Sequence, residues 1–184
     1  MEIIELIREA RQGSTASQKY LFDLLSDKMM LVCVRYLKSR EDAEEAMLNG
    51  FYKFFNKLPL FQYQGDAALN AWLKKIMVNE CLMILRRKNV FTIVTEAAAA
   101  EIPFMEDALN NLSAKEIFNL ILELPVGYRT VFNLHVIEGL DHKEISSLLS
   151  INEGTSKSQL SKAKSLLQKK LLLNGTTYVK RKSQ

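Results

Sequence analysis

Five lysines on one helical stretch near the C-terminus carry the strongest chemical signal in this sequence. The stretch runs GLDHKEISSLLSINEGTSKSQLSKAKSLLQKK, and its second half holds Lys157, Lys162, Lys164, Lys169 and Lys170. Only one acid, Glu153, accompanies them. Ammonium groups repeated along one helix can neutralise phosphates, so the pattern favours a polyanionic partner such as DNA. An ordinary amphipathic hairpin with a solvated lysine face is the alternative interpretation.

Two short helices joined by a tight turn would position these lysines. Asp141, followed three residues later by Glu144, forms a capping pair that starts the first helix. Residues 150–152 form the turn, and Asn152 is a suitable N-cap for the second helix. At 100° per residue, the second helix should bury a stripe made of Ser156, Leu160, Ala163, Leu167 and Leu171. The pattern predicts a helix-turn-helix.

The side of the second helix that faces away from this stripe carries the groups that a recognition helix needs. Hydroxyl and amide groups near its N-terminus can reach base edges in the major groove, and lysines can neutralise the flanking phosphates. We expect Gln159 to lie on the shoulder of this exposed face. The predicted DNA-binding residues of this helix are Thr155, Lys157, Ser158, Gln159, Lys162 and Lys164.

The remaining reactive residue types give no sign of catalysis or metal binding. Cys33 and Cys81 lie far apart in sequence, each within an apolar helical stretch, so we expect buried structural thiols in a reducing compartment. There is no CxxC motif, and His135 and His142 are not spaced as metal ligands with the cysteines. No carboxylate pair, nucleophile motif or phosphate-binding loop stands out. We therefore expect no metal, no cofactor and no enzymatic activity, although an enzyme remains a rival hypothesis.

Helical periodicity dominates the chain, and strand signals are nearly absent. Helices are expected over residues 16–38, from about Glu41 to Pro59, over 67–88, from Ser113, and up to Gly139. Residues 91–112 carry four acids and no base, whereas residues 1–90 carry 14 bases and 11 acids. We predict an all-α fold with two small helical domains, residues 1–90 and 112–173. A flexible acidic linker (91–111) joins them and a basic tail (174–184) follows.

The second half resembles the promoter-binding domain of bacterial sigma factors of the extracytoplasmic-function (ECF) class. The resemblance rests on LELPVGYRTVFNLHVIEGLDHKEISSLLSINEGTSKSQLSKAKSLLQKKL. In the first half, RYLKSREDAEEAMLNGFYKFFNKLPLFQYQGDAALNAWLKKIMVNECLMILRRK resembles the N-terminal domain of the same family. The two matches stand in the family's order and cover about 150 residues. The resemblance implies a sigma factor that binds core RNA polymerase and promoter DNA and assists promoter melting, with an anti-sigma factor as a candidate partner.

The resemblance also implies site residues in the first half. The acidic helix of the family docks on the largest polymerase subunit, and here its positions are Asp42, Glu44, Glu45, Met47 and Leu48. In the family, a loop captures a flipped base of the minus-ten element. The basic end of the helix that follows this loop contacts phosphates of the duplex upstream of the bubble. The corresponding residues are Gln62, Tyr63, Gln64, Asp66, Asn79, Arg86, Arg87 and Lys88. We expect Trp72 to belong to the core rather than to stack on a base.

Three departures from the family pattern lie in the helix-turn-helix. Ser150 replaces a glycine in the turn, Ser156 replaces a valine on the buried stripe, and Gln159 replaces an arginine. A stand-alone helix-turn-helix regulator that binds DNA as a dimer is the second rival hypothesis, but it leaves the match of the first half unexplained.

The acidic start of the chain does not resemble a signal peptide, and no apolar run reaches the ~18 residues of a membrane span. The expected location is cytoplasmic, without membrane insertion.

Overall fold

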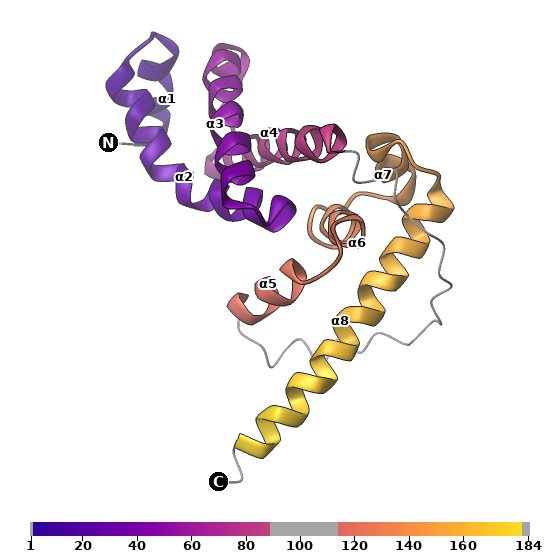
Figure 1. Ribbon diagram of the computed structural model, residues 1–184. Coiled ribbons are helices and arrows are strands. Elements are labelled where there is room, and N and C mark those ends of the chain that lie inside the picture. The colour runs from indigo at the N-terminus through magenta and orange to yellow at the C-terminus, as the bar shows by residue number, and fades with distance from the viewer. Residues whose placement is uncertain (1, 89–113, 182–184) are drawn as a thin grey trace. The chain divides into compact units, whose positions relative to one another are not determined.

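The computed structural model describes residues 2–88 and 114–181, with side chains up to Leu172 in the last helix. These residues form helices and no strand, which confirms the all-α prediction. The chain divides into two compact units after Lys88 (Figure 1). Each unit has its own buried apolar core.

Four helices build the first unit: α1 (Ile3–Arg11), α2 (Thr15–Leu37), α3 (Arg40–Lys57) and α4 (Asp66–Arg87). Serine side chains cap two of them. Ser14 accepts a hydrogen bond from the Ser17 amide at the start of α2, and Ser39 accepts one from the Asp42 amide at the start of α3. A 3-10 turn, Leu58–Leu60, follows α3 at Pro59, where we expected the helix to stop.

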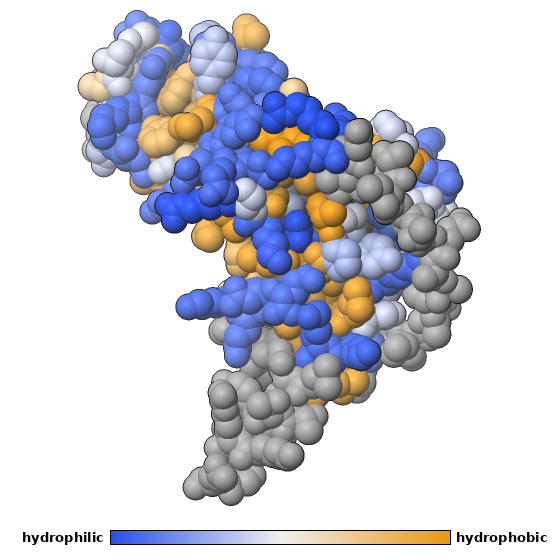
Figure 2. Space-filling model, in the orientation of Figure 1, coloured by the Kyte–Doolittle hydropathy of each residue, from blue (hydrophilic) through white to orange (hydrophobic). Residues whose placement is uncertain are grey.

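The core of this unit lies where α2, α3 and α4 pack on one another. Helices α3 and α4 approach so closely that a Cβ at Gly50 would overlap the Met77 thioether. Glu80 of α4 is buried, and both its oxygens accept hydrogen bonds from Lys53 of α3, at 2.7 and 2.9 Å. Both predicted buried thiols, Cys33 and Cys81, lie in this core and are free. The face of the unit that Figure 2 shows is mainly hydrophilic, with a few apolar patches.

The second unit contains α5 (Ala114–Leu122), α6 (Val126–Phe132), a π-helical segment (Asn133–Ile137), α7 (His142–Leu149) and α8 (Glu153–Arg181). Arg129 of α6 is buried, and its guanidinium donates to the carbonyls of Leu122 and Leu124, at 3.2 and 2.9 Å. These bonds satisfy backbone groups that the end of α5 leaves unpaired. Burial lowers the pKa of Arg129 from its ordinary value.

Three parts of the fold differ from the expectations or lie beyond them. Helix α1 was not predicted, although Leu6, Ile7 and Ala10 bury one of its faces. The π-helical segment interrupts the helix expected to run up to Gly139. Helix α8 continues to Arg181, past the point where we expected a separate basic tail. The predicted acidic linker, residues 91–111, lies outside the described residues.

Candidate nucleic-acid interface

Residues 61–65 form a loop of irregular backbone whose two ends are fixed to the first unit. At its start, the Phe61 ring stacks on Trp72 of α4, with ring centroids 4.4 Å apart and planes 8° apart. At its end, Gly65 adopts a φ of 98°, which suits glycine, and its carbonyl accepts from the Leu69 amide in the first turn of α4. Trp72 is half-buried and also lies beside Phe54, so it belongs to an aromatic cluster at the edge of the core rather than to the fully buried core that we expected.

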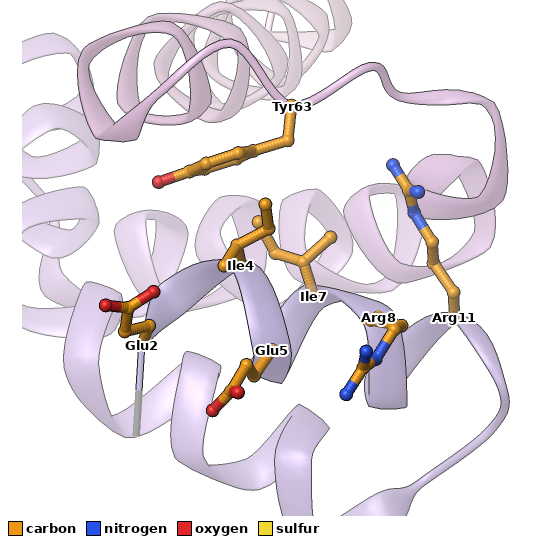
Figure 3. Close-up of a pocket in the computed structure, with 7 residues that line it drawn as sticks. All are labelled: Glu2, Ile4, Glu5, Ile7, Arg8, Arg11 and Tyr63. Atoms are coloured by element: carbon orange, nitrogen blue, oxygen red, sulfur yellow. The ribbon is translucent and has the colours of Figure 1, made fainter.

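The side chains between these two ends face solvent. Gln62 and Gln64 are exposed, and Tyr63 is half-exposed. The Tyr63 hydroxyl donates to the Asp66 carboxylate, and this hydrogen bond raises the pKa of Tyr63 above its ordinary value of 10.0. An open pocket lies between this loop and α1, and the Tyr63 ring extends over Ile4 and Ile7 (Figure 3). Two amides and a phenol ring on one loop can bond to base edges and offer a stacking surface.

An exposed line along α4 continues from this loop towards the basic end of the helix. Lys75, Asn79 and Met83 follow one another at steps of four residues, and all three are exposed. Asn79 is therefore accessible to a partner, and its role in DNA binding stays a prediction. Lys75 was not among the predicted residues, although its spacing of four from Asn79 was a usable signal.

The predicted polymerase-binding acids and the predicted DNA-binding bases meet in the structure. Lys88 Nζ lies 2.5 Å from Asp42 Oδ2, and Arg87 Nη2 lies 2.7 Å from Glu45 Oε1. These pairs could not be predicted from the sequence, because the partners are more than forty residues apart. Both pairs join the start of α3 to the end of α4. In the free protein, two of the predicted DNA-binding cations are therefore paired with two of the predicted polymerase-binding acids.

The two apolar residues predicted to bind polymerase point in different directions. Leu48 is 57% exposed, and Tyr52, one turn later on α3, is 70% exposed. Met47 is only 8% exposed and packs in the core. Its predicted place on the docking surface is wrong, because consecutive residues of a helix are 100° apart and α3 turns Met47 inwards.

The helix-turn-helix has the predicted caps. Asp141 accepts from the Glu144 amide at 2.7 Å, and Glu144 accepts from the Asp141 amide at 2.8 Å, which completes a capping box at the start of α7. Asn152 accepts from the Thr155 amide at 2.6 Å at the start of α8. Ser150 adopts a left-handed conformation with a φ of 55°, at the position where the family pattern has glycine.

Gln159 is fully buried, so its predicted place on the exposed shoulder of α8 is wrong. Its amide lies against Gly127 of α6, 3.5–3.7 Å from where a Cβ of that residue would lie. Among the described residues, neither amide atom has a hydrogen-bond partner. We expected α8 to bury one narrow stripe, but α8 packs on both α6 and α7, which widens its buried arc to include Gln159.

The other predicted contacts of the recognition helix stay accessible. Lys157 and Ser158 are exposed, and Thr155, Lys162 and Lys164 are half-buried. Lys157 lies 3.8 Å from Glu153, an i,i+4 pair that water can readily separate. Ser161, which the sequence analysis did not select, is partly exposed on the same side as Ser158. This face of α8 therefore presents small hydroxyls flanked by lysines.

Two histidines join the π-helical segment to α7 beneath this face. The His135 and His142 rings stack, with centroids 4.6 Å apart and planes 11° apart. His135 Nδ1 bonds to the Leu140 carbonyl, and His142 Nδ1 bonds to the Ser156 hydroxyl of α8, both at 2.8 Å. Burial, the neighbouring His135 and the charge of Lys157 lower the pKa of His142 from its ordinary value of 6.5.

Within residues 2–88 and 114–172, no cluster of three or more histidine, cysteine or acidic side chains is arranged to hold a metal ion. In the helices that are described, none is both long and apolar enough to cross a membrane.

Comparison with known proteins assigns both units. The family model "Sigma-70 region 2" matches residues 21–90, and "Sigma-70, region 4" matches residues 114–167. The ECF RNA polymerase sigma factor SigW of Bacillus subtilis is 27% identical, covering 93% of this chain and 97% of its own length. The ECF RNA polymerase sigma-E factor of Haemophilus influenzae is 24% identical, covering 90% of this chain and 93% of its own length.

A solved structure, that of CnrH in complex with the cytosolic domain of CnrY, aligns with a TM-score of 0.48 and 18% identity. The alignment covers 92% of this chain and 96% of the chain in the solved structure. The region 2 match lies in the first unit, which carries the loop 61–65, and the region 4 match lies in the second unit, which carries the helix-turn-helix. Together the two matches span well over half of the residues. The chain belongs to the sigma-70 family as an RNA polymerase sigma factor of the ECF class, a family that directs core polymerase to specific promoters.

Proposed function

We propose that this sigma factor reads the two promoter elements with two separate surfaces, one on each unit. The first is the loop 61–65 with the exposed line of α4, and the second is the exposed face of α8. The observation that carries the proposal is the loop, because its ends are fixed while Gln62 and Gln64 remain exposed. A held loop with free amides is suited to select among bases of an opened strand.

The first unit, residues 1–90, acts in this proposal as region 2. Gln62, Tyr63 and Gln64 meet an extruded base of the minus-ten element, and Asp66 orients Tyr63 through their hydrogen bond. Asn79 on α4, with Lys75 one turn before it, lies along the path of the opened strand. Arg86, Arg87 and Lys88 meet duplex phosphates upstream of the bubble.

The second unit, residues 112–173, acts as region 4 and reads the minus-thirty-five element. The N-terminal turns of α8 enter the major groove with Thr155, Lys157, Ser158 and Ser161. Lys162 and Lys164 follow towards the phosphate backbone. Gln159 is not among the contacts, because it is buried. Residues 91–111 connect the two units and 174–184 follow the second.

Polymerase docks on the start of α3. Asp42, Glu44 and Glu45 supply negative charge there, and Leu48 with Tyr52 supplies exposed apolar surface. The combination of an apolar patch and a charged rim is typical of protein interfaces. The exposed apolar residues Tyr20, Leu24 and Leu31 of α2 are a candidate site for an anti-sigma factor.

The mechanism needs no catalytic group of this chain, since polymerase performs the chemistry, and we propose that the protein is not an enzyme. Because its partners are polymerase and the chromosome, we place it in the cytoplasm. Run-off transcription tests the proposal: core polymerase with this protein should initiate at specific promoters that core polymerase alone ignores. Tight, specific promoter binding by the free protein, without any stimulation of polymerase, would instead support the stand-alone regulator.

A further inference from the structure

Helix α1 contacts the base-reading loop although it lies outside the matched family region, which begins at residue 21. Its inner face is held in the first unit by three buried residues, Leu6, Ile7 and Ala10. Its last residue, Arg11, reaches away from α1 towards the loop (Figure 3). The helix is therefore a fixed support from which one long side chain meets the loop.

The guanidinium of Arg11 binds the backbone at the point where the loop begins. Arg11 Nε donates to the Leu58 carbonyl at 3.1 Å, and Arg11 Nη2 donates to the Phe61 carbonyl. Leu58 opens the 3-10 turn, and Phe61 is the first residue of the loop. One planar group thus fixes both ends of the turn that precedes Gln62. A guanidinium can do this because its donors form a rigid fork.

We propose that Arg11 is a positioning residue for base reading by the loop 61–65. The side chain does not need to touch DNA. It holds the backbone of Phe61 in place while the Phe61 ring stacks on Trp72. The positions of Gln62 and Tyr63, which follow directly, are thereby fixed relative to the first unit. Without Arg11, the two carbonyls lose their bonds to the guanidinium. The loop then keeps the Phe61–Trp72 stack at its start, and the Tyr63–Asp66 hydrogen bond and Gly65 towards its end. This inference rests on the proposed role of the loop in reading the minus-ten element.

Arg8 provides a matched control on the same helix. It lines the same pocket and carries the same charge, yet among the described residues it makes no hydrogen bond to the loop. If α1 acted only through its positive charge near DNA, Arg8→Ala and Arg11→Ala would have similar effects. If Arg11 acts through the loop, only Arg11→Ala should alter which bases are selected.

The experiment is transcription by the full-length protein with core polymerase on a promoter library randomised in the minus-ten element, with a second library randomised in the minus-thirty-five element. Arg11→Ala should reduce discrimination at the minus-ten position by about tenfold, the equivalent of one charge-assisted hydrogen bond. The minus-thirty-five preference should stay unchanged, which shows that the holoenzyme assembles and that region 4 still reads DNA. Arg8→Ala should leave both preferences unchanged.

A proportional loss of transcription on every minus-ten sequence, with the preference intact, would overturn the inference, because it would mean that Arg11 is merely structural. If Arg11→Ala does not fold, Arg11→Lys decides the question. It keeps the charge but replaces the planar fork by a single ammonium, and it should show weakened minus-ten selection in a folded protein. Unchanged selection by folded Arg11→Lys and Arg11→Ala would also overturn it. Failure of the wild-type protein to select any minus-ten sequence would instead contradict the proposed function.

Discussion

Lys88 Nζ lies 2.5 Å from Asp42 Oδ2, so the end of α4 is bonded to the start of α3. The Asp42 side chain is only 19% exposed, whereas Lys88 is 53% exposed. Arg87 and Glu45 repeat this arrangement beside them at 2.7 Å. A cation that neutralises a carboxylate of its own protein attracts phosphate less strongly. A partner that takes over the acids of α3 would release cations for DNA.

Asp42→Asn should therefore strengthen DNA binding by the free protein at low salt, by up to about fivefold for one exposed pair. The gain should disappear in Asp42→Asn with Lys88→Ala, because no released cation remains. Fluorescence anisotropy with a labelled fork-junction DNA at several salt concentrations measures both variants. Glu44→Gln is the matched control, since Glu44 pairs with Arg40 on its own helix rather than with α4. An equal gain in Asp42→Asn and Glu44→Gln, which add the same charge, would show that total charge, not the Asp42–Lys88 pair, controls affinity.

Gln159→Met should stabilise the second unit, because it replaces two buried amide atoms without partners by an apolar side chain of similar length. The expected gain in the free energy of unfolding is about 1 kcal/mol. Urea denaturation measures it, with Ser158→Ala on the exposed side as the control. The minus-thirty-five preference should not change. A new preference in Gln159→Met would place this side chain on DNA and contradict its buried position.

Features set by neighbouring residues were predictable from the sequence. The capping pair Asp141–Glu144 and the Asn152 cap depend on residues within one turn, and both are present. Helical periodicity located α2, α3 and α4 because each buries apolar side chains at steps of three and four.

Features that depend on packing between distant segments were not predictable. Whether Gln159 is exposed depends on α6 covering that side of α8. Whether Met47 is exposed depends on how α3 is rotated in the core. The Asp42–Lys88 pair and the Arg11 bonds to the loop join residues more than forty positions apart. A single sequence carries no signal for such contacts.

Arg129→Met should destabilise the second unit by about 2–4 kcal/mol, because it removes the buried guanidinium that bonds the carbonyls of Leu122 and Leu124. Chemical denaturation followed by circular dichroism measures the change. Arg40→Met, at an exposed position on α3, serves as the control and should change stability little. An Arg129→Met protein as stable as the wild type would show that the end of α5 does not need these bonds.

The stability of the second unit should fall as the pH is lowered through the range below 6.5. The folded state lowers the pKa of His142, so the unfolded chain takes up a proton more readily and is favoured once the pH drops below its ordinary value of 6.5. Above that value, His142 is neutral in both states and contributes no pH dependence. Nuclear magnetic resonance titration of the His142 ring should give a midpoint below 6.5, and His135→Gln should move it upwards. A midpoint at or above 6.5 would contradict the stacked arrangement of the two rings.

Selection of promoter sequences by the holoenzyme tests the two-surface account most directly. Core polymerase with this protein transcribes a library randomised in both elements, and the selected promoters are sequenced. We predict two separate selected blocks. Gln62→Ala with Gln64→Ala should weaken selection only in the minus-ten block, and Lys157→Ala with Ser158→Ala only in the minus-thirty-five block. Both pairs of substitutions altering the same block, or no selection by the wild-type protein, would contradict the account.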